Sequence, residues 1–216
     1  LGNLDSPPLA ARKSFHPIVL TVLQPQDGEE LANPFPQRPA PCAACRPLAG
    51  KPLIAYSIEQ AMASRFIDRV IVSTEDRKIA KIAKQYGAEV PFVRPKKLAT
   101  DKSAIIDVLL HAMDYMEKRE KFRFDIVVLL HATAPLRSVE NIDNVIRLLV
   151  EKKAENVFSV TTSYRNPYFN MVEMTKGGFV RLVKKGNFAT RQSAPKVFDM
   201  NASIYVWWKD ILQKKK

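Results

Sequence analysis

The chain has 216 residues, of which 46% are hydrophobic and 26% charged, values typical of a globular domain rather than a disordered chain. No apolar run approaches the roughly 20 residues that a membrane helix needs, so no membrane partner is expected. The net charge of +12 is spread along the chain without the arginine-rich arm or the aromatic–basic alternation of strand binders. The charge therefore favours an anionic small substrate over nucleic acid.

The N-terminal end and the cysteines carry little functional signal. Residues 1–16 lack an apolar block preceded by positive charge, so they are predicted to be a disordered or non-native extension rather than a secretory signal. Cys42 and Cys45 form a lone C-x-x-C, which favours reduced thiols over a zinc or redox site. A cytoplasmic protein is expected.

Short apolar runs alternate with segments of helical period from residue 18 to residue 160. Strands are predicted at 18–23, 70–72, 90–93, 126–130 and 157–160, and helices at 52–64, 75–86, 103–118 and 139–150. This order predicts an α/β fold, with a Rossmann-like, mostly parallel sheet and helices on both faces.

The pattern changes after residue 166. Residues 169–183, with Gly177-Gly178 in the middle, predict a β-hairpin, and residues 204–208 predict a further strand. We interpret the hairpin as an excursion over the active face, so that residues 17–216 form a single domain.

Ligands of open parallel sheets bind beyond the carboxyl ends of the strands. The predicted strands lead there into residues 73–76, 94–101 and 131–137. Seven strings in and around these segments resemble the acylneuraminate cytidylyltransferases, the family of CMP-sialic acid synthetases: V-S-T-E-D at 72–76, Y-G-A-E-V-P-F-V-R-P at 86–95, L-A-T-D at 98–101, L-L-H-A-T-A-P-L-R at 129–137, F-S-V-T at 158–161, R-Q-S-A-P at 191–195 and N-A-S-I-Y at 201–205.

The resemblance covers residues 46–210 and implies a nucleotide-diphospho-sugar transferase fold. It implies an enzyme that uses CTP and Mg²⁺ to activate a nine-carbon sugar acid, such as sialic, legionaminic or pseudaminic acid, to its CMP-sugar, with release of pyrophosphate. Family members are often dimers, with the hairpin reaching toward the partner. Alternatives are another nucleotidyltransferase of this fold, for example a Kdo cytidylyltransferase, and a non-catalytic homologue.

The resemblance also implies residue roles. It places three residues at the nucleotide: Arg94, Asp101 and Ser103. It places six at the sugar acid: His131, Thr133, Arg137, Arg191, Gln192 and Asn201.

Each role has a structural alternative. Arg94 would equally suit a surface ion pair, Asp101 a helix cap, and Arg137 an ion pair with Glu140. Many relatives carry Gln where His131 stands, and a His at a strand end is as often structural. Ala202 replaces a glycine of the family's N-G-[AS] segment.

One stretch departs from the family. In the family, the first strand is followed by A-R-x-G-S-K-G-x-x-x-K-N, whose small and basic residues approach the triphosphate. Here residues 24–45 contain five prolines and an acidic Q-D-G-E-E, and the family's Lys-Asn pair falls on Ala43 and Ala44.

Two hypotheses account for this departure: a stretch read out of frame, or a genuine divergent loop. The family's acidic D-x-D segment, which helps hold magnesium, would follow Lys216, so the domain is interpreted as C-terminally truncated. The chain is therefore expected to be inactive or nearly so, with its catalytic residues and metal ligands unassigned.

Overall fold

The computed structural model describes residues 15–22, 43–100 and 103–214 of the chain. The predictions for residues 1–14, for Asp101 and for most of the loop at 24–45 lie outside this part. The chain divides into two compact units, which are described separately. The first combines Leu1–Phe158 with Ser203–Lys216, and the second is Ser159–Ala202.

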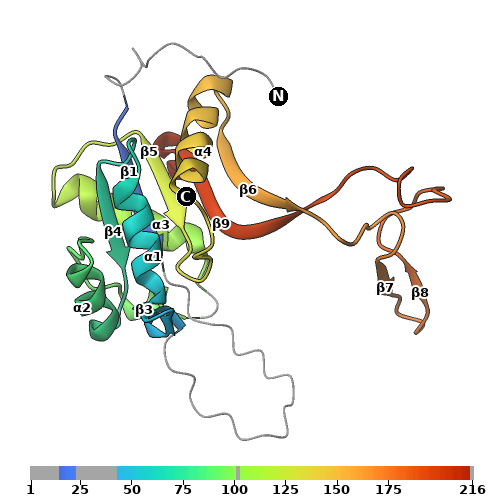
Figure 1. Ribbon diagram of the computed structural model, residues 1–216, viewed down its shortest axis with the longest axis horizontal. Helices are drawn as coiled ribbons and strands as arrows, with labels where there is room; N and C mark the ends of the chain where they lie inside the picture. Colours follow the sequence, from blue (N-terminus) through green and yellow to red (C-terminus); the bar gives the residue numbers. More distant parts are fainter. Residues whose placement is uncertain (1–14, 23–42, 101–102, 215–216) are drawn as a thin grey trace, which may run out of the picture. The chain divides into compact units, whose positions relative to one another are not determined.

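The largest sheet has five strands in the order β4-β1-β5-β9-β6 (Figure 1). Its strands are β1 (Pro17–Val22), β4 (Arg69–Ser73), β5 (Ile126–Leu130), β6 (Asn156–Thr162) and β9 (Phe198–Trp208). β1 is parallel to both β4 and β5, whereas β9 is antiparallel to β5. The predicted α/β class with a mostly parallel sheet is confirmed.

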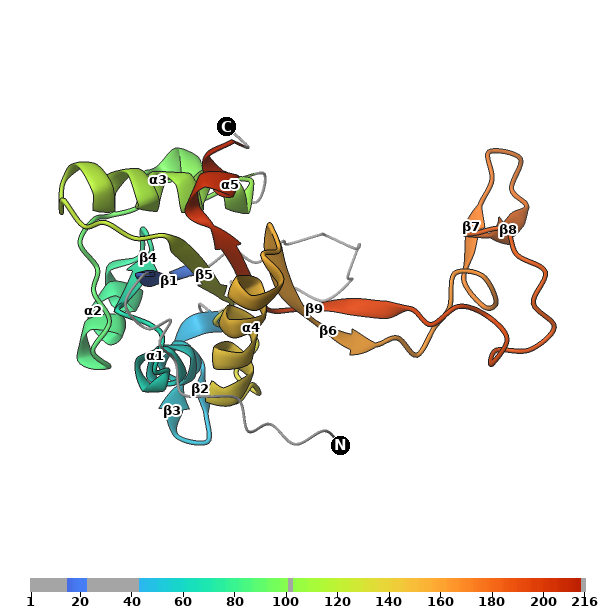
Figure 2. The same cartoon turned by 90° about the horizontal axis from the view of Figure 1, so that it is seen from above.

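Helices cover both faces of this sheet, as the view in Figure 2 shows. Buried side chains of α1 (Leu53–Ala63), α2 (Arg77–Gln85) and α4 (Val139–Lys152) pack on one face. Those of α3 (Ile105–Lys118) and α5 (Lys209–Gln213) pack on the other. This two-sided cover explains why β5 is an uninterrupted apolar run.

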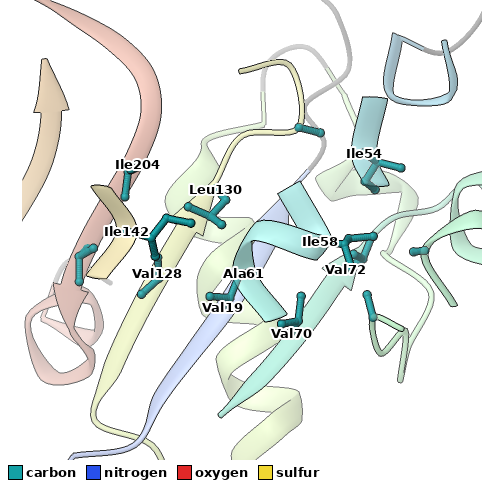
Figure 3. Packing of buried hydrophobic residues seen from close by; sticks show 14 of the residues in the cluster. Val19, Ile54, Ile58, Ala61, Val70, Val72, Val128, Leu130, Ile142 and Ile204 are labelled. Carbon is teal, nitrogen blue, oxygen red and sulfur yellow. The ribbon is translucent and has the colours of Figure 1, made fainter. Parts of the chain in front are cut away.

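Successive side chains of β5 point to opposite faces of the sheet, so they pack into two different hydrophobic cores. Val128 and Leu130 point to the α1 side together with Ile58, whereas Val127 and Leu129 point to the α3 side (Figure 3). Each such fully buried aliphatic side chain stabilises the fold by about 1.5–3 kcal/mol. The core therefore fixes the sheet on which the loops at the carboxyl edge stand.

Most predicted elements are present with bounds that differ by at most three residues, although β9 begins six residues before the strand predicted at 204–208. One prediction is wrong, and some short elements were not predicted. The strand predicted at 90–93 is wrong: a single parallel bridge joins Glu89 to Ile71, because the chain turns away at once toward the loop that begins with Arg94. The sequence also gave no sign of the small antiparallel pair β2 (Pro47–Leu48) and β3 (Lys51–Pro52), or of two short 3-10 helices, Ala43–Cys45 and Lys96–Leu98.

The second unit contains the predicted hairpin, formed by β7 (Val172–Met174) and β8 (Val180–Leu182). Gly178 lies in the connecting turn with φ +79°, a conformation that glycine adopts without strain. Within this unit only Asn166 and Ala194 are buried, so the unit has almost no core of its own. In the described part of the chain, no helix combines the length and the apolarity needed to cross a membrane.

Candidate active site

The order of the parallel strands reverses at β1, which has β4 on one side and β5 on the other. β1 runs between β4 and β5, with Val22 beside Ser73 and Leu20 beside Leu129. The loops that follow β4 and β5 therefore leave the sheet on opposite sides of β1, which is the position where open α/β sheets bind ligands. Arg94 and the segment 131–137 both stand at this edge.

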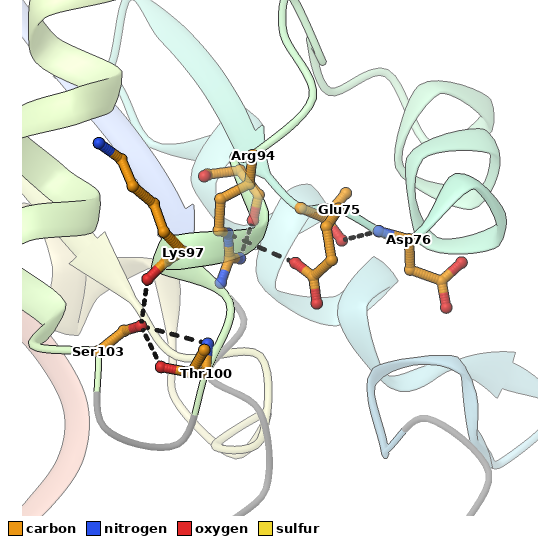
Figure 4. A network of polar contacts seen from close by, with 8 residues as sticks. Glu75, Asp76, Arg94, Lys97, Thr100 and Ser103 are labelled. Carbon is orange, nitrogen blue, oxygen red and sulfur yellow. Dashed lines mark hydrogen bonds and ion pairs between the residues drawn. The ribbon is translucent and has the colours of Figure 1, made fainter.

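Arg94 lies at the end of β4 and is almost completely buried, with 1% of its surface exposed (Figure 4). Its guanidinium donates to the Ser73 carbonyl oxygen, and its Nε lies 3.6 Å from Glu75 Oε2. Its backbone N–H donates to the Thr74 carbonyl at 3.0 Å. Burial lowers the pKa of Arg94, and the Glu75 carboxylate opposes that shift.

The hydroxyl groups of Thr100 and Ser103 form a small cluster with the Lys97 carbonyl, also drawn in Figure 4. Ser103 Oγ donates to the Lys97 carbonyl at 3.2 Å and lies 2.9 Å from Thr100 Oγ1. These bonds join Lys97, Thr100 and Ser103, whereas Asp101 lies outside the described residues. Ser103 is half-buried and precedes α3 by two positions.

The loop after β5 begins at His131, whose backbone is firmly held. Its N–H donates to the Ser203 carbonyl at 3.3 Å, and its carbonyl accepts from Ser57 Oγ at 3.3 Å. The imidazole is half-buried, and its ring centre lies 5.7 Å from that of Tyr205. Burial, reinforced by the charge of Arg137, lowers the pKa of His131 and favours the neutral form.

Arg137, at the end of the same loop, is buried beneath it with 8% of its surface exposed. Its guanidinium contacts α1, β9 and the loop itself through Gln60, Ser203, Ser57 and His131. Burial lowers the pKa of Arg137 to about 10, so it remains a cation at neutral pH. Within the described residues no carboxylate pairs with it, so the predicted alternative of an ion pair with Glu140 is not observed. Thr133, between His131 and Arg137, is exposed.

The remaining predicted site residues belong to the second unit. Arg191 donates to the Tyr164 carbonyl oxygen and stacks over the Tyr164 ring at 4.9 Å. Asn201 Oδ1 accepts from Ser159 Oγ at 2.7 Å, and Gln192 is exposed. Each therefore has a defined place within its own unit.

The positions that correspond to the family's Lys-Asn pair are small and apolar. Ala43 is half-buried, and Ala44, 3% exposed, packs in the core below α1 and α2. The described residues contain no group of three or more His, Cys, Asp or Glu side chains that fits a metal ion. Within these residues the structure therefore contains no ready-made site for magnesium.

Sequence reasoning missed several residues that shape this edge. Glu75 pairs with Arg94, Tyr205 lies beside His131, and Ser57 and Gln60 on α1 contact Arg137. Glu75 and Tyr205 lie within two of the strings that resemble the family, V-S-T-E-D and N-A-S-I-Y. Their membership of these strings is the signal that could have identified them. Ser57 and Gln60 had no local signal, because they are ordinary residues of an amphipathic helix.

A Rossmann-like sheet with an arginine and two polar loops at its carboxyl edge is the architecture of a nucleotide-binding α/β protein. Residues 44–204 match the cytidylyltransferase family, and the chain belongs to that family.

Some of its relatives are named as synthases of CMP-sugar acids. The chain is 43% identical over 160 residues to the CMP-N,N'-diacetyllegionaminic acid synthase of Campylobacter jejuni, covering 74% of this chain and 68% of that protein. It shares the same identity and coverage with the post-translational flagellin modification protein B of Campylobacter coli. Among solved structures, CMP:2-keto-3-deoxy-manno-octonic acid synthetase complexed with CTP has the same fold, with a TM-score of 0.60 at 15% identity over 93% of this chain and 77% of that one.

Proposed function

We propose that this chain is built to join a nine-carbon sugar acid to CMP. In the proposed reaction the anomeric hydroxyl oxygen attacks the α-phosphorus of CTP. A new P–O bond forms, the bond from the α-phosphorus to the bridging oxygen breaks, pyrophosphate leaves and the hydroxyl proton is released. The observation that carries the proposal is the shared position of Arg94 and the loop 131–137 on the two sides of β1, in a chain of this family.

Such a reaction depends on positioning and on neutralising phosphate charge. We assign the nucleotide to the β4 side, with Arg94, Asp101 and Ser103, and the sugar acid to the β5 side, with His131 and Thr133. Arg191, Gln192 and Asn201 of the second unit are proposed for the sugar acid as well. Arg94 suits the nucleotide because its planar fork matches phosphate or base acceptors.

Legionaminic-type acids are the favoured acceptors. A second CMP-N,N'-diacetyllegionaminic acid synthase, from Legionella pneumophila, is 32% identical over 161 residues and 68% of its own length. The N-acylneuraminate cytidylyltransferase of Escherichia coli is 37% identical, but over 117 residues and 26% of its length. A Kdo cytidylyltransferase or a non-catalytic homologue remain the alternatives.

Nucleotide binding tests the first half of the proposal. Thermal unfolding is measured with CTP, UTP, ATP and GTP, and selective stabilisation by CTP is expected. The variant Arg94→Ala should lose that stabilisation, whereas Arg119→Ala, an exposed arginine at the end of α3, should keep it. Equal stabilisation by all four nucleotides, or by none, would count against a cytidylyltransferase.

Turnover tests the second half. We propose that pyrophosphate release is slow because residues 24–45 bring acids and prolines where the family has cations. Replacing them with the family's A-R-x-G-S-K-G-x-x-x-K-N loop should raise CTP-dependent pyrophosphate release, with di-N-acetyllegionaminic acid preferred to N-acetylneuraminic acid and Kdo. If the unmodified chain released pyrophosphate at ordinary enzymatic rates, the expectation that it is nearly inactive would be refuted. We also propose that the reaction needs Mg²⁺, so omitting Mg²⁺ from the same assay should abolish pyrophosphate release.

We also propose that the second unit binds a second copy of the chain. It has almost no core, yet it exposes large apolar side chains on its hairpin, including Met174 and Phe179, each 77% exposed. A small unit without a core gains stability when such surface is buried against a partner.

A further inference from the structure

Arg137 forms a closed hydrogen-bond network at the base of the loop 131–137. Its Nε donates to Gln60 Oε1 at 3.0 Å. Its Nη1 donates to the Ser203 carbonyl oxygen at 2.7 Å and to Ser203 Oγ at 3.2 Å. Its Nη2 donates to the His131 carbonyl oxygen at 2.8 Å and to Ser57 Oγ. A guanidinium has five N–H donors, so these contacts use its full capacity.

The acceptors are themselves tied to the loop. Gln60 Nε2 donates to the carbonyl oxygens of Pro135 and Arg137, both at 2.8 Å. Ser57, which has no exposed surface, donates to the His131 carbonyl. A substrate carboxylate that took Arg137 would have to break several of these buried bonds, and each broken bond would leave a buried polar group unsatisfied.

His131 is the residue on which the network converges. Its carbonyl oxygen accepts from Arg137, Ser57 and the backbone N–H of Ala134, and its own N–H donates to the Ser203 carbonyl, which also accepts from Arg137. The main chain of His131 is therefore fixed against α1 and β9 at once. The imidazole that it carries faces the Tyr205 ring at the same edge.

We propose that Arg137 is a positioning residue that acts through His131 by fixing its main chain, and that it is not a direct ligand of the substrate carboxylate. The inference rests on the proposed function only in placing His131 at the sugar acid. A neutral imidazole offers one donor and one acceptor, as an amide does. A cation fixed nearby, with no carboxylate beside it in the described part of the chain, opposes protonation of that ring.

The test follows the titration of His131 by NMR of histidine-labelled protein without substrate, with the signal assigned from His131→Gln. Burial lowers the pKa of His131 and the charge of Arg137 lowers it further, so Arg137→Gln should raise this pKa toward the ordinary value. Arg137→Lys keeps the charge but not the planar fork, so it should leave the pKa low while exposing the His131 amide to faster hydrogen exchange. Arg147→Gln removes the same charge from α4 and should leave the pKa of His131 unchanged. An Arg137→Gln variant in which neither the His131 pKa nor the hydrogen exchange of the His131 amide changes would overturn the proposal.

A second measurement needs no variant, so it holds even if those at Arg137 fail to fold. The side-chain N–H signals of Arg137 are followed while N-acetylneuraminic acid or di-N-acetyllegionaminic acid is added. We expect His131 signals to move and the Arg137 Nε–H signal to stay in place. A direct shift of Arg137 saturating with the ligand would show a substrate contact and overturn the proposal. If the titration behaves as expected while neither acid binds, the positioning role stands and the proposed function fails.

Discussion

Histidine protonation is expected to make stability depend on pH. Burial lowers the pKa of His131, with Arg137 contributing, and burial also lowers that of His111, where Lys97 and Arg94 add to the effect and Asp114 opposes it. Below the ordinary value of 6.5 the unfolded chain therefore takes up protons that the folded chain resists, and the free energy of unfolding falls as the pH falls.

The measurement is urea unfolding between pH 7.5 and pH 5. His131→Gln should reduce the loss of stability over this range, His111→Gln should reduce it separately, and the double variant should reduce it further. The two effects should add because the residues lie on different elements, the β5 loop and α3. Identical pH profiles of the wild type and both variants would contradict this explanation.

Ala202 has φ +47°, the left-handed region in which a Cβ is strained by about 1–2 kcal/mol. Ala202→Gly relieves this strain but adds freedom to the unfolded chain, so a net gain of roughly 0.5–1 kcal/mol is expected in urea unfolding. Ala63→Gly, at the exposed end of α1, is the matched control. Because Ala63 is helical, that variant should lose up to about 1 kcal/mol. A loss in both variants would contradict strain at Ala202.

At the scale of elements, α4 begins immediately after Arg137 with a capping box. Ser138 Oγ accepts from the Asn141 N–H at 3.2 Å, and Asn141 Oδ1 accepts from the Ser138 N–H at 3.1 Å. Ser138→Ala should cost about 1 kcal/mol in the free energy of unfolding, whereas Ser138→Asp keeps an acceptor and should be nearly neutral. Equal costs for the two variants would show that packing, not capping, sets the start of α4.

Comparison of the predicted with the observed helices and strands shows which of them local sequence patterns can predict. Helical period predicted α1, α3 and α4 closely, and the fully apolar run predicted β5, because both signals are written in consecutive residues. The run at 90–93 had the composition of a strand but no partner beyond Glu89, and pairing is a long-range property. β2 and β3 are too short to produce any periodicity.

At the scale of the whole molecule, the apolar hairpin predicts self-association. Met174→Asp or Phe179→Asp places a charge on the exposed apolar surface and should weaken a dimer measured by analytical ultracentrifugation, because a buried unpaired charge is costly. Lys176→Gln, on the same hairpin, should leave the association unchanged. A wild-type chain that sediments as a monomer at all accessible concentrations would contradict the proposed dimer.

The sequence by itself determined the fold class, the order of the principal elements and the family, because apolar period and short strings are local properties. It also named Arg94, His131 and Arg137 as residues of interest. Tertiary structure alone decided what those residues contact: Arg137 bonds to Ser57 and Ser203, 80 and 66 positions away, and Arg94 to the carbonyl of Ser73, 21 positions away. No local pattern encodes such partners, since an arginine at a strand end looks the same whether it faces a substrate or is enclosed by its own chain.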